Sequence, residues 1–174
     1  IYYCWGVQEY DPKKSIVPNV HIKYFKCHNE RDLLDRFFTH WSHNYPDIVT
    51  GWNSRLFDMS YICNRVLRIL GDKMMKKLSP WGIVNENSIV IGGNSHPVFD
   101  VYGIQQLDYL DLFKKFGYTY GTQESYKLDH IAHVVLGDSK IDYSEYGSLN
   151  GLYLNDYQKF IDYNIKDVEI VDLS

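Results

Sequence analysis

Residues 47–71 read DIVTGWNSRLFDMSYICNRVLRILG, and the order of elements within them sets the class of the whole chain. Residues 47–52 are mostly apolar and predict a short strand, and residues 53–56 (NSRL) follow as a loop. Asp58 is placed to cap a helix over residues 59–70, where apolar side chains recur at helical spacing, and Gly71 to end it. A strand, a loop and a helix in this order are typical of an α/β domain.

Upstream of this unit the sequence predicts two strands and a helix. Residues 2–10 are rich in aromatic side chains, and residues 19–25 alternate apolar with polar ones. Asn29 and Asp32 have a spacing analogous to a capping box at the start of a helix. The buried stripe of that helix is expected to consist of Leu33, Leu34, Phe37, Phe38 and Trp41.

Downstream, turn residues separate two β-prone runs. Residues 89–91 and 98–101 flank the segment GGNS at residues 92–95, and this pattern predicts a β-hairpin. Residues 107–116 are expected to run from a strand into a helix.

The C-terminal third of the chain predicts two helices joined by a polar loop. Residues 126–136 form the first helix, residues 138–149 the loop, and Asn155 caps the last helix. No repeat or low-complexity linker interrupts the 174 residues, so we expect a single domain over residues 1–174.

Amino-acid composition excludes only a few classes of function. The formal net charge is -4, which disfavours a protein that wraps duplex DNA by charge alone, but suits a nuclease that holds metal ions with carboxylates. The three cysteines, Cys4, Cys27 and Cys63, form no Cys-x-x-Cys pair, so we expect free thiols rather than a zinc site. No apolar run has the length of a membrane span, so no membrane partner is expected.

Two short patterns carry the candidate chemistry. Asn53-x-x-x-Phe57-Asp58 follows a predicted strand and opens a predicted helix, and Tyr163-x-x-x-Asp167 lies within the last helix. The i, i+4 spacing places Tyr163 and Asp167 on one face of that helix. Each pattern also has a structural explanation: Asp58 as a helix cap, and Tyr163 with Asp167 as a polar surface pair.

Together the patterns resemble the exonuclease motifs of family B DNA polymerases. TGWN at residues 50–53 with Phe57-Asp58 resembles the second motif, and YNIKDV at residues 163–168 resembles the third. The intervening LSP (78–80), LDYLDL (107–112) and SYKL (125–128) are similar to polymerases of T-even-type bacteriophages. The resemblance implies a ribonuclease H-like fold with an inserted hairpin over residues 89–101 and a four-carboxylate, Tyr-type 3′→5′ exonuclease used in proofreading.

The resemblance also implies roles for individual residues. Asp58 and Asp167 are expected to bind Mg²⁺ or Mn²⁺, ions that suit oxygen ligands and act as a pair about 4 Å apart. Tyr163 is expected to orient the attacking water, and Asn53 and Phe57 to hold the terminal nucleotides. The implied partners are the single-stranded 3′ end of primer DNA and the remainder of a polymerase chain, in the cytoplasm of an infected bacterium.

The chain departs from the family pattern in one respect. The first motif, Asp-x-Glu, does not occur before Asn53, and the Asp-x-Glu at residues 167–169 is on a predicted helix, where Asp167 and Glu169 face different directions. We therefore expect a fragment that begins after the first motif, lacks the N-terminal strands of the fold and has little exonuclease activity. An open sheet edge would favour dimerisation by strand pairing.

Two other functions fit the same residues. One is a non-catalytic single-stranded nucleic-acid-binding module that keeps the ribonuclease H-like fold, and the other is a free-standing nuclease, which the truncated ends disfavour. Asp108 and Asp111 are interpreted as structural. Lys140 is interpreted as a solvated side chain, with contact to a DNA phosphate as the less frequent alternative.

Overall fold

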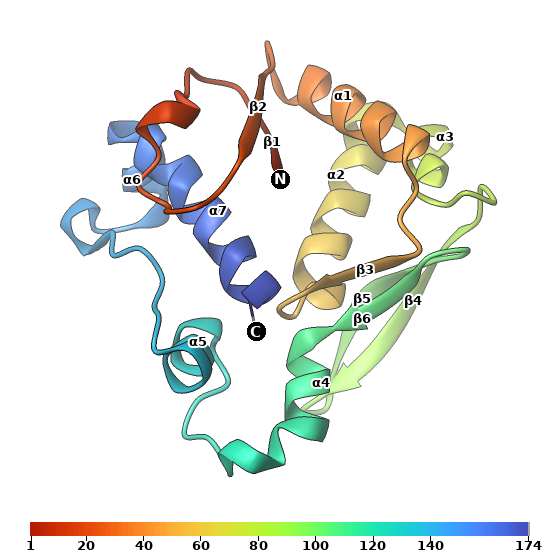
Figure 1. The fold of residues 1–174 in the computed structure, drawn as a ribbon. Coiled ribbons are helices and arrows are strands. Elements are labelled where there is room, and N and C mark those ends of the chain that lie inside the picture. The colour runs from red at the N-terminus through yellow and green to blue at the C-terminus, as the bar shows by residue number, and fades with distance from the viewer. Residues whose placement is uncertain (174) are drawn as a thin grey trace. The chain divides into compact units, whose positions relative to one another are not determined.

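The computed structural model describes residues 1–173, which contain both helices and strands (Figure 1). The mixed α/β class predicted from the sequence is confirmed. The chain divides into two compact units, one formed by residues 1–33 with those from 122 onward, the other by residues 34–121. Of the described helices, none is both long and apolar enough to span a membrane.

The first unit contains a two-stranded parallel sheet. β1 (Tyr2–Gly6) pairs with β2 (Ile22–Lys26), and the short helix η1 (Pro12–Lys14) lies in the connection. Both strands are shorter than the predicted 2–10 and 19–25. Asn19 is outside β2, because it has a φ of 60°, a left-handed conformation that a strand does not accommodate.

One long helix, α7 (Tyr157–Leu173), packs on this sheet (Figure 1). Ile161 and Ile165 enter a core with Tyr10 and Val17. The strand side chains against this core are Tyr2, Cys4, Ile22 and Tyr24. They are alternate residues of each strand, as expected where only one face of a sheet is covered by the helix.

A buried carboxylate ties α7 to the loop after β1. The Asp162 side chain is 1% exposed. Its Oδ1 accepts hydrogen bonds from the hydroxyls of Tyr10 and Ser15, both at 2.7 Å, and its Oδ2 accepts from the backbone N–H of Ile16 at 3.1 Å. Because Asp162 directly precedes Tyr163, these bonds fix the helix at the candidate site.

The stretch between the second unit and α7 contains a helix and a polar loop. The helix predicted over residues 126–136 is α5 (Leu128–Leu136), and it ends where Gly137 adopts the left-handed conformation with a φ of 66°. The predicted loop 138–149 contains a single turn, η5 (Ser144–Tyr146).

The predicted cap of the last helix was wrong. Asn155 ends a separate helix, α6 (Leu149–Asn155), which Ser148 caps by accepting from the N–H of Gly151. α7 begins at the next residue but one, because the Asp156 carboxylate accepts a hydrogen bond from the N–H of Lys159 at 3.0 Å.

The first predicted helix is confirmed as α1 (Glu30–His43). The Asn29 side chain accepts from the N–H of Asp32 at 3.0 Å, while the Asp32 carboxylate accepts from the N–H of His28 at 2.9 Å. This reciprocal pair is the predicted capping arrangement, except that the Asp32 carboxylate accepts from the N–H of His28 and not from that of the cap residue Asn29. In the predicted apolar stripe, Leu34 and Phe38 are buried.

The second unit is built around a parallel strand pair. β3 (Ile48–Gly51) pairs with β6 (Gln105–Asp108), and Gly51 lies opposite Asp108 at their C-terminal ends. β6 leads directly into α4 (Tyr109–Phe116), so the predicted change from strand to helix is confirmed. Shorter helical segments of this unit are α3 (Asp72–Met75), η3 (Lys76–Leu78) and η4 (Gly117–Tyr120).

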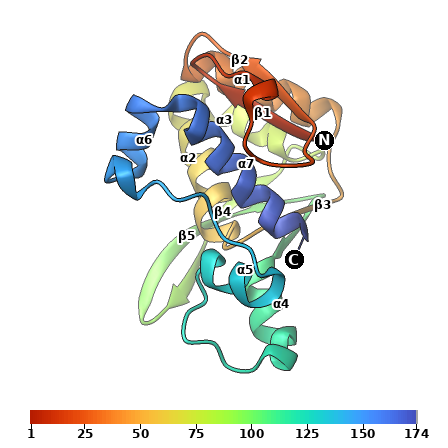
Figure 2. The same ribbon diagram turned by 60° about the vertical axis from the view of Figure 1, so that its left-hand side comes forward.

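The predicted hairpin is present and longer than expected (Figure 2). β4 (Val84–Ile91) pairs antiparallel with β5 (Asn94–Val101). The turn is only Gly92 and Gly93, with φ values of 57° and 83°. Positive φ at both central residues is typical of the tight turns that join paired strands, and glycine adopts it without strain.

The structure corrects the interpretation of Asp58 as a helix cap. A single π-helical turn, η2 (Arg55–Met59), precedes α2 (Ser60–Leu70), and Asp58 lies inside this turn. The N–H of Met59 donates to the carbonyl of Ser54 at 2.9 Å, which is the wider spacing of a π turn. Met59, and not Asp58, is therefore the residue at the cap position of α2.

Candidate active site

Tyr163 and Asp167 lie one turn apart on α7, as their spacing predicts. The Tyr163 side chain is buried, with 8% of the residue exposed. Asp167 is half-buried. These residues are therefore not an ordinary polar pair on an open helix surface.

Lys140 contacts both of them from the loop after α5. Its Nζ donates a hydrogen bond to Asp167 Oδ2 at 2.9 Å and a longer one to the Tyr163 hydroxyl at 3.4 Å. The same ammonium lies 5.4 Å from the centre of the Tyr163 ring. The Lys140 side chain is 26% exposed, so the interpretation of Lys140 as a freely solvated residue was wrong.

Among the described residues, one carboxylate oxygen of Asp167 lacks a hydrogen-bond donor or a cation as its partner. Within residues 1–173, Asp167 Oδ1 is buried and has no hydrogen-bond partner. Burial raises the pKa of Asp167 above the ordinary carboxyl value, and the Lys140 ammonium only partly opposes this. A carboxylate with one buried, unpaired oxygen is destabilised as an anion, and a bound cation would relieve that cost.

The phenol of Tyr163 stays protonated well into the alkaline range. Burial and the nearby Asp167 carboxylate raise its pKa, and Lys140 opposes them. The ring of Tyr143 meets the Tyr163 ring edge-on, with centroids 5.2 Å apart. Tyr163 can therefore donate a hydrogen bond from a fixed position.

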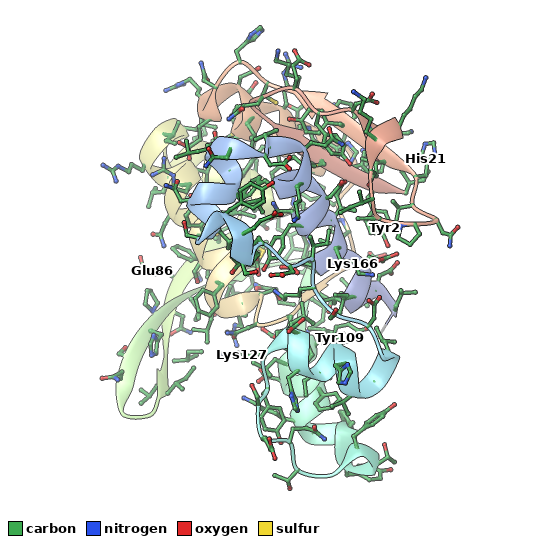
Figure 3. The ribbon with its side chains drawn as sticks, turned by 90° about the vertical axis from the view of Figure 1, so that its left-hand side faces the viewer. Tyr2, His21, Glu86, Tyr109, Lys127 and Lys166 are labelled. Atoms are coloured by element: carbon green, nitrogen blue, oxygen red, sulfur yellow. The ribbon has the colours of Figure 1, made fainter. Side chains whose placement is uncertain are left out.

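The neighbouring acid on α7 is engaged elsewhere. Glu169 Oε2 accepts from Lys166 at 2.8 Å, and Lys166 also reaches Asp138 at 2.6 Å. Figure 3 labels Lys166 on α7. Asp167 and Glu169 thus bind different lysines, in agreement with the prediction that they face different directions.

The loop between β3 and α2 carries the other predicted site residues. Asn53 has a φ of 59°, the left-handed conformation that Asn tolerates better than most residues. Asp108 holds this loop, because its Oδ1 accepts from the N–H of Asn53 at 2.8 Å and its Oδ2 from the N–H of Arg55 at 3.2 Å. Asp108 is structural, as interpreted, and its structural role is to position the candidate substrate loop.

Phe57 and Asp58 are both on the outside of the π turn. Phe57 is 67% exposed, so its ring is accessible to a binding partner. The turn is tied to the hairpin by an ion pair of 2.7 Å between Arg55 and Asp100 and by the Ser60 hydroxyl, which donates to the carbonyl of Pro97 at 3.1 Å.

The structure thus groups the predicted site residues into two sets, one on each unit. Tyr163 and Asp167 form the first set, and Asn53, Phe57 and Asp58 the second. That Asp58 and Asp167 converge on one site stays a prediction. In the described part of the chain, no three acidic, His or Cys side chains are grouped closely enough to hold a metal ion by themselves.

Comparison with known proteins shows the family of the chain. The model of the DNA polymerase family B exonuclease domain matches residues 6–131. A DNA-directed DNA polymerase of Enterobacteria phage T4 is 40% identical over 150 residues, which cover 86% of this chain and 16% of that protein. A DNA-directed DNA polymerase of Escherichia phage RB69 is 37% identical over 147 residues, covering 84% of this chain and 16% of the relative.

The chain spans about a sixth of the length of these two relatives. More distant similarity extends to a DNA polymerase of Choristoneura fumiferana nuclear polyhedrosis virus, at 26% identity over 84% of the chain and 14% of that protein. The family match covers well over half of the chain and includes the loop with Asn53 and Asp58. This chain belongs to the exonuclease domain family of the family B DNA polymerases.

Proposed function

We propose that the chain is a single proofreading domain of a phage-type DNA-directed DNA polymerase, which removes mispaired nucleotides from the 3′ end of primer DNA. On this proposal residues 1–174 adopt a ribonuclease H-like fold in which the β4–β5 hairpin is an inserted element. The phage relatives support this assignment, because they are DNA polymerases that match the chain over more than four fifths of its length. The remainder of the polymerase would be its partner, in the cytoplasm of an infected bacterium.

The observation that carries the proposal is the grouping of Asp167, Tyr163 and Lys140. Hydrolysis of a phosphodiester needs an oriented water and compensation for the negative charge that develops. Tyr163 holds a protonated phenol next to a carboxylate, and Lys140 supplies a cation at 2.9 Å from that carboxylate. A surface pair without a catalytic role has no need of a buried phenol and a buried, unpaired carboxylate oxygen.

The donor set fits a hard divalent ion in part. Asp167 offers an unpartnered buried oxygen, and Asp58 offers a carboxylate on an exposed turn. Mg²⁺ and Mn²⁺ favour oxygen ligands of this kind, so we assign Asp58 and Asp167 as ligands in a Tyr-type, four-carboxylate site. A bound pair of ions would activate water and stabilise the leaving oxygen.

The residues of the loop after β3 would bind the DNA end. Phe57 presents an exposed ring on which a base can stack, an interaction worth about 1–3 kcal/mol that does not depend on sequence. Asn53, held in the left-handed conformation by Asp108, would present its side-chain amide to the same nucleotides. Recognition that ignores base identity is what the removal of any mismatch requires.

Two of the four carboxylates of the proposed site are absent from these 174 residues. We therefore propose that the chain alone hydrolyses DNA weakly, since a site with half its acidic ligands binds the ion pair poorly. Robust metal-dependent degradation of single-stranded DNA by the purified chain would overturn this part of the proposal. Pairing of an open strand edge between two copies remains a prediction, testable by sedimentation of the chain.

Metal binding is the direct test. The chain is titrated calorimetrically with Mn²⁺, alone and as Asp58→Ala, Asp167→Ala and the control Asp35→Ala. Asp35 is an exposed acid of α1 outside both sets. The proposal predicts a heat of binding that is reduced in the first two variants and retained in the control. Equal heats from all four proteins would remove Asp58 and Asp167 from the ligand set.

A second function is favoured by the exposure of aromatic side chains on the π turn and α2. Phe57 and Tyr61 are 67% and 66% exposed. A non-catalytic module for single-stranded nucleic acid would use such rings for stacking without metal. It is distinguished by oligonucleotide binding that is unchanged by EDTA and by a blocked 3′ end, whereas the nuclease proposal predicts dependence on both.

A further inference from the structure

The loop that carries Lys140 is held at its beginning by contacts to α5 and α7. Gly137 turns the chain out of α5 in the left-handed conformation. At the next residue, Asp138 Oδ2 pairs with Lys166 of α7 at 2.6 Å, and the Lys166 side chain is only 11% exposed. The loop therefore leaves α5 already fastened to the helix that carries Tyr163 and Asp167.

A second acid fastens Lys140 itself. Asp129 lies in the first turn of α5, and its Oδ1 accepts a hydrogen bond from the backbone N–H of Lys140 at 2.8 Å. A long flexible side chain such as lysine reaches a defined target only if its backbone is fixed, because each free rotation lowers the fraction of time spent in contact. The Asp129 contact supplies that fixed point.

The placement of Asp129 has an electrostatic side as well. Its charge acts on Asp167 in the same sense as burial, raising the pKa of that carboxyl. The Asp129 carboxylate contacts the backbone N–H of Lys140, while the Lys140 ammonium contacts Asp167 and Tyr163. The two acids thus use different parts of the same residue.

We propose that Asp129 is a positioning residue, which holds Lys140 against Asp167 and Tyr163 by fixing its backbone. This inference rests on the proposed function, because the position of the Lys140 ammonium affects hydrolysis only if Tyr163 and Asp167 belong to a nuclease site. Asp129 itself contacts none of the proposed reacting groups. Its positioning effect passes through the backbone of Lys140, separately from the action of its charge on Asp167.

The test separates the hydrogen bond from the charge. Asp129→Asn keeps a side-chain oxygen that accepts from the Lys140 N–H and removes the charge, whereas Asp129→Ala removes both. Asp142→Ala is a matched control, because Asp142 is an exposed acid whose carboxylate accepts from the N–H of Ser144 in the following stretch of the chain. All variants concern exposed acids and are expected to fold.

Two NMR measurements on the isotope-labelled chain report the outcome without metal. Hydrogen exchange of the Lys140 amide is expected to be about 10-fold faster in Asp129→Ala and within roughly 3-fold of wild type in Asp129→Asn. The coupling across the hydrogen bond between Lys140 Nζ and the Asp167 carboxyl should be lost in the alanine variant alone. The Lys166–Glu169 contact should be unchanged in all variants, which excludes general loosening of α7.

Failure of this inference is distinguishable from failure of the nuclease proposal. If Lys140 exchange and the Lys140–Asp167 coupling are the same in Asp129→Ala as in wild type, Asp129 does not position Lys140. Equal effects of the Ala and Asn variants would also overturn it, because they would assign the effect to charge. If the wild-type chain gives no heat of Mn²⁺ binding, the proposed metal site is refuted, but the proposed role of Asp129 is not affected.

Discussion

The buried Asp162 carboxylate offers the clearest quantitative prediction for stability. Replacement by alanine leaves three donors without their acceptor: the hydroxyls of Tyr10 and Ser15 and the N–H of Ile16. A hydrogen bond to a charged group contributes about 1.5–3 kcal/mol, and a buried donor left unpaired costs a comparable amount. The donors on Ser15 and Ile16 are only partly buried, so water recovers some of that cost.

We therefore expect Asp162→Ala to lower the free energy of unfolding by roughly 3–5 kcal/mol. Asp162→Asn should cost about 2–3 kcal/mol, because the amide retains one oxygen but turns an NH₂ group toward a donor. Tyr10→Phe removes a single bond and should cost about 1–2 kcal/mol. The Asn and Phe variants together should cost less than their sum by about 1 kcal/mol, since they share one contact.

Urea-induced unfolding, followed by circular dichroism and by tryptophan fluorescence, measures these differences. Asp142→Asn is the control, since Asp142 is exposed, and it should stay within about 0.5 kcal/mol of wild type. An Asp162→Asn variant as stable as that control would show that the buried carboxylate does not stabilise the fold in this way. Strict additivity of the Asp162 and Tyr10 variants would show that the two side chains are not bonded.

Three further predictions concern the candidate site. As the pH rises from acidic to neutral, Asp167→Asn should become more stable relative to wild type. The pKa of Asp167 is raised in the folded protein, so the folded wild-type protein loses stability as this carboxyl releases its proton, and the Asn variant has no such proton to lose. Denaturant unfolding of both proteins across this pH range measures the difference. Asn53→Gly should be nearly neutral and Asn53→Ala should cost about 1 kcal/mol in unfolding experiments, since only the alanine is strained at a φ of 59°. Arg55→Met and Asp100→Asn should each destabilise the hairpin by less than about 1 kcal/mol, given their partial exposure, and a double-mutant cycle should show coupling.

Local structure was predictable from the sequence where the deciding contact lies within a few residues. The Asn29–Asp32 cap depends on one turn of helix, and the Gly92–Gly93 turn depends on the φ preference of glycine. Both were therefore readable from spacing and residue type. The change from strand to helix around Asp108 was predictable for the same reason, because Asp108 caps α4 through the N–H of Leu110.

Local structure was not predictable where a distant contact selects the conformation. The π turn before α2 is accompanied by a hydrogen bond from Ser60 to the carbonyl of Pro97 on β5, which no local rule anticipates. The parallel pairing of β3 with β6 likewise brings Asp108 to the loop with Asn53. The role of Lys140 was missed because a lysine in a polar loop is usually solvated, and only the tertiary structure places this one on Asp167.

The acids of the candidate site divide by the partners of their oxygens. Asp108 and Asp129 accept hydrogen bonds from backbone N–H groups, and these bonds fix the loops of Asn53 and Lys140. Asp162 is likewise satisfied by Tyr10, Ser15 and Ile16. Asp167 differs, because its Oδ1 is buried and unpartnered within residues 1–173. An acid that binds N–H groups stabilises a loop without any cation, whereas an acid with an unmet oxygen becomes more stable when a cation arrives. Among these four carboxylates, Asp167 is therefore the one proposed as a metal ligand, whereas each of the others holds its own loop or helix in place.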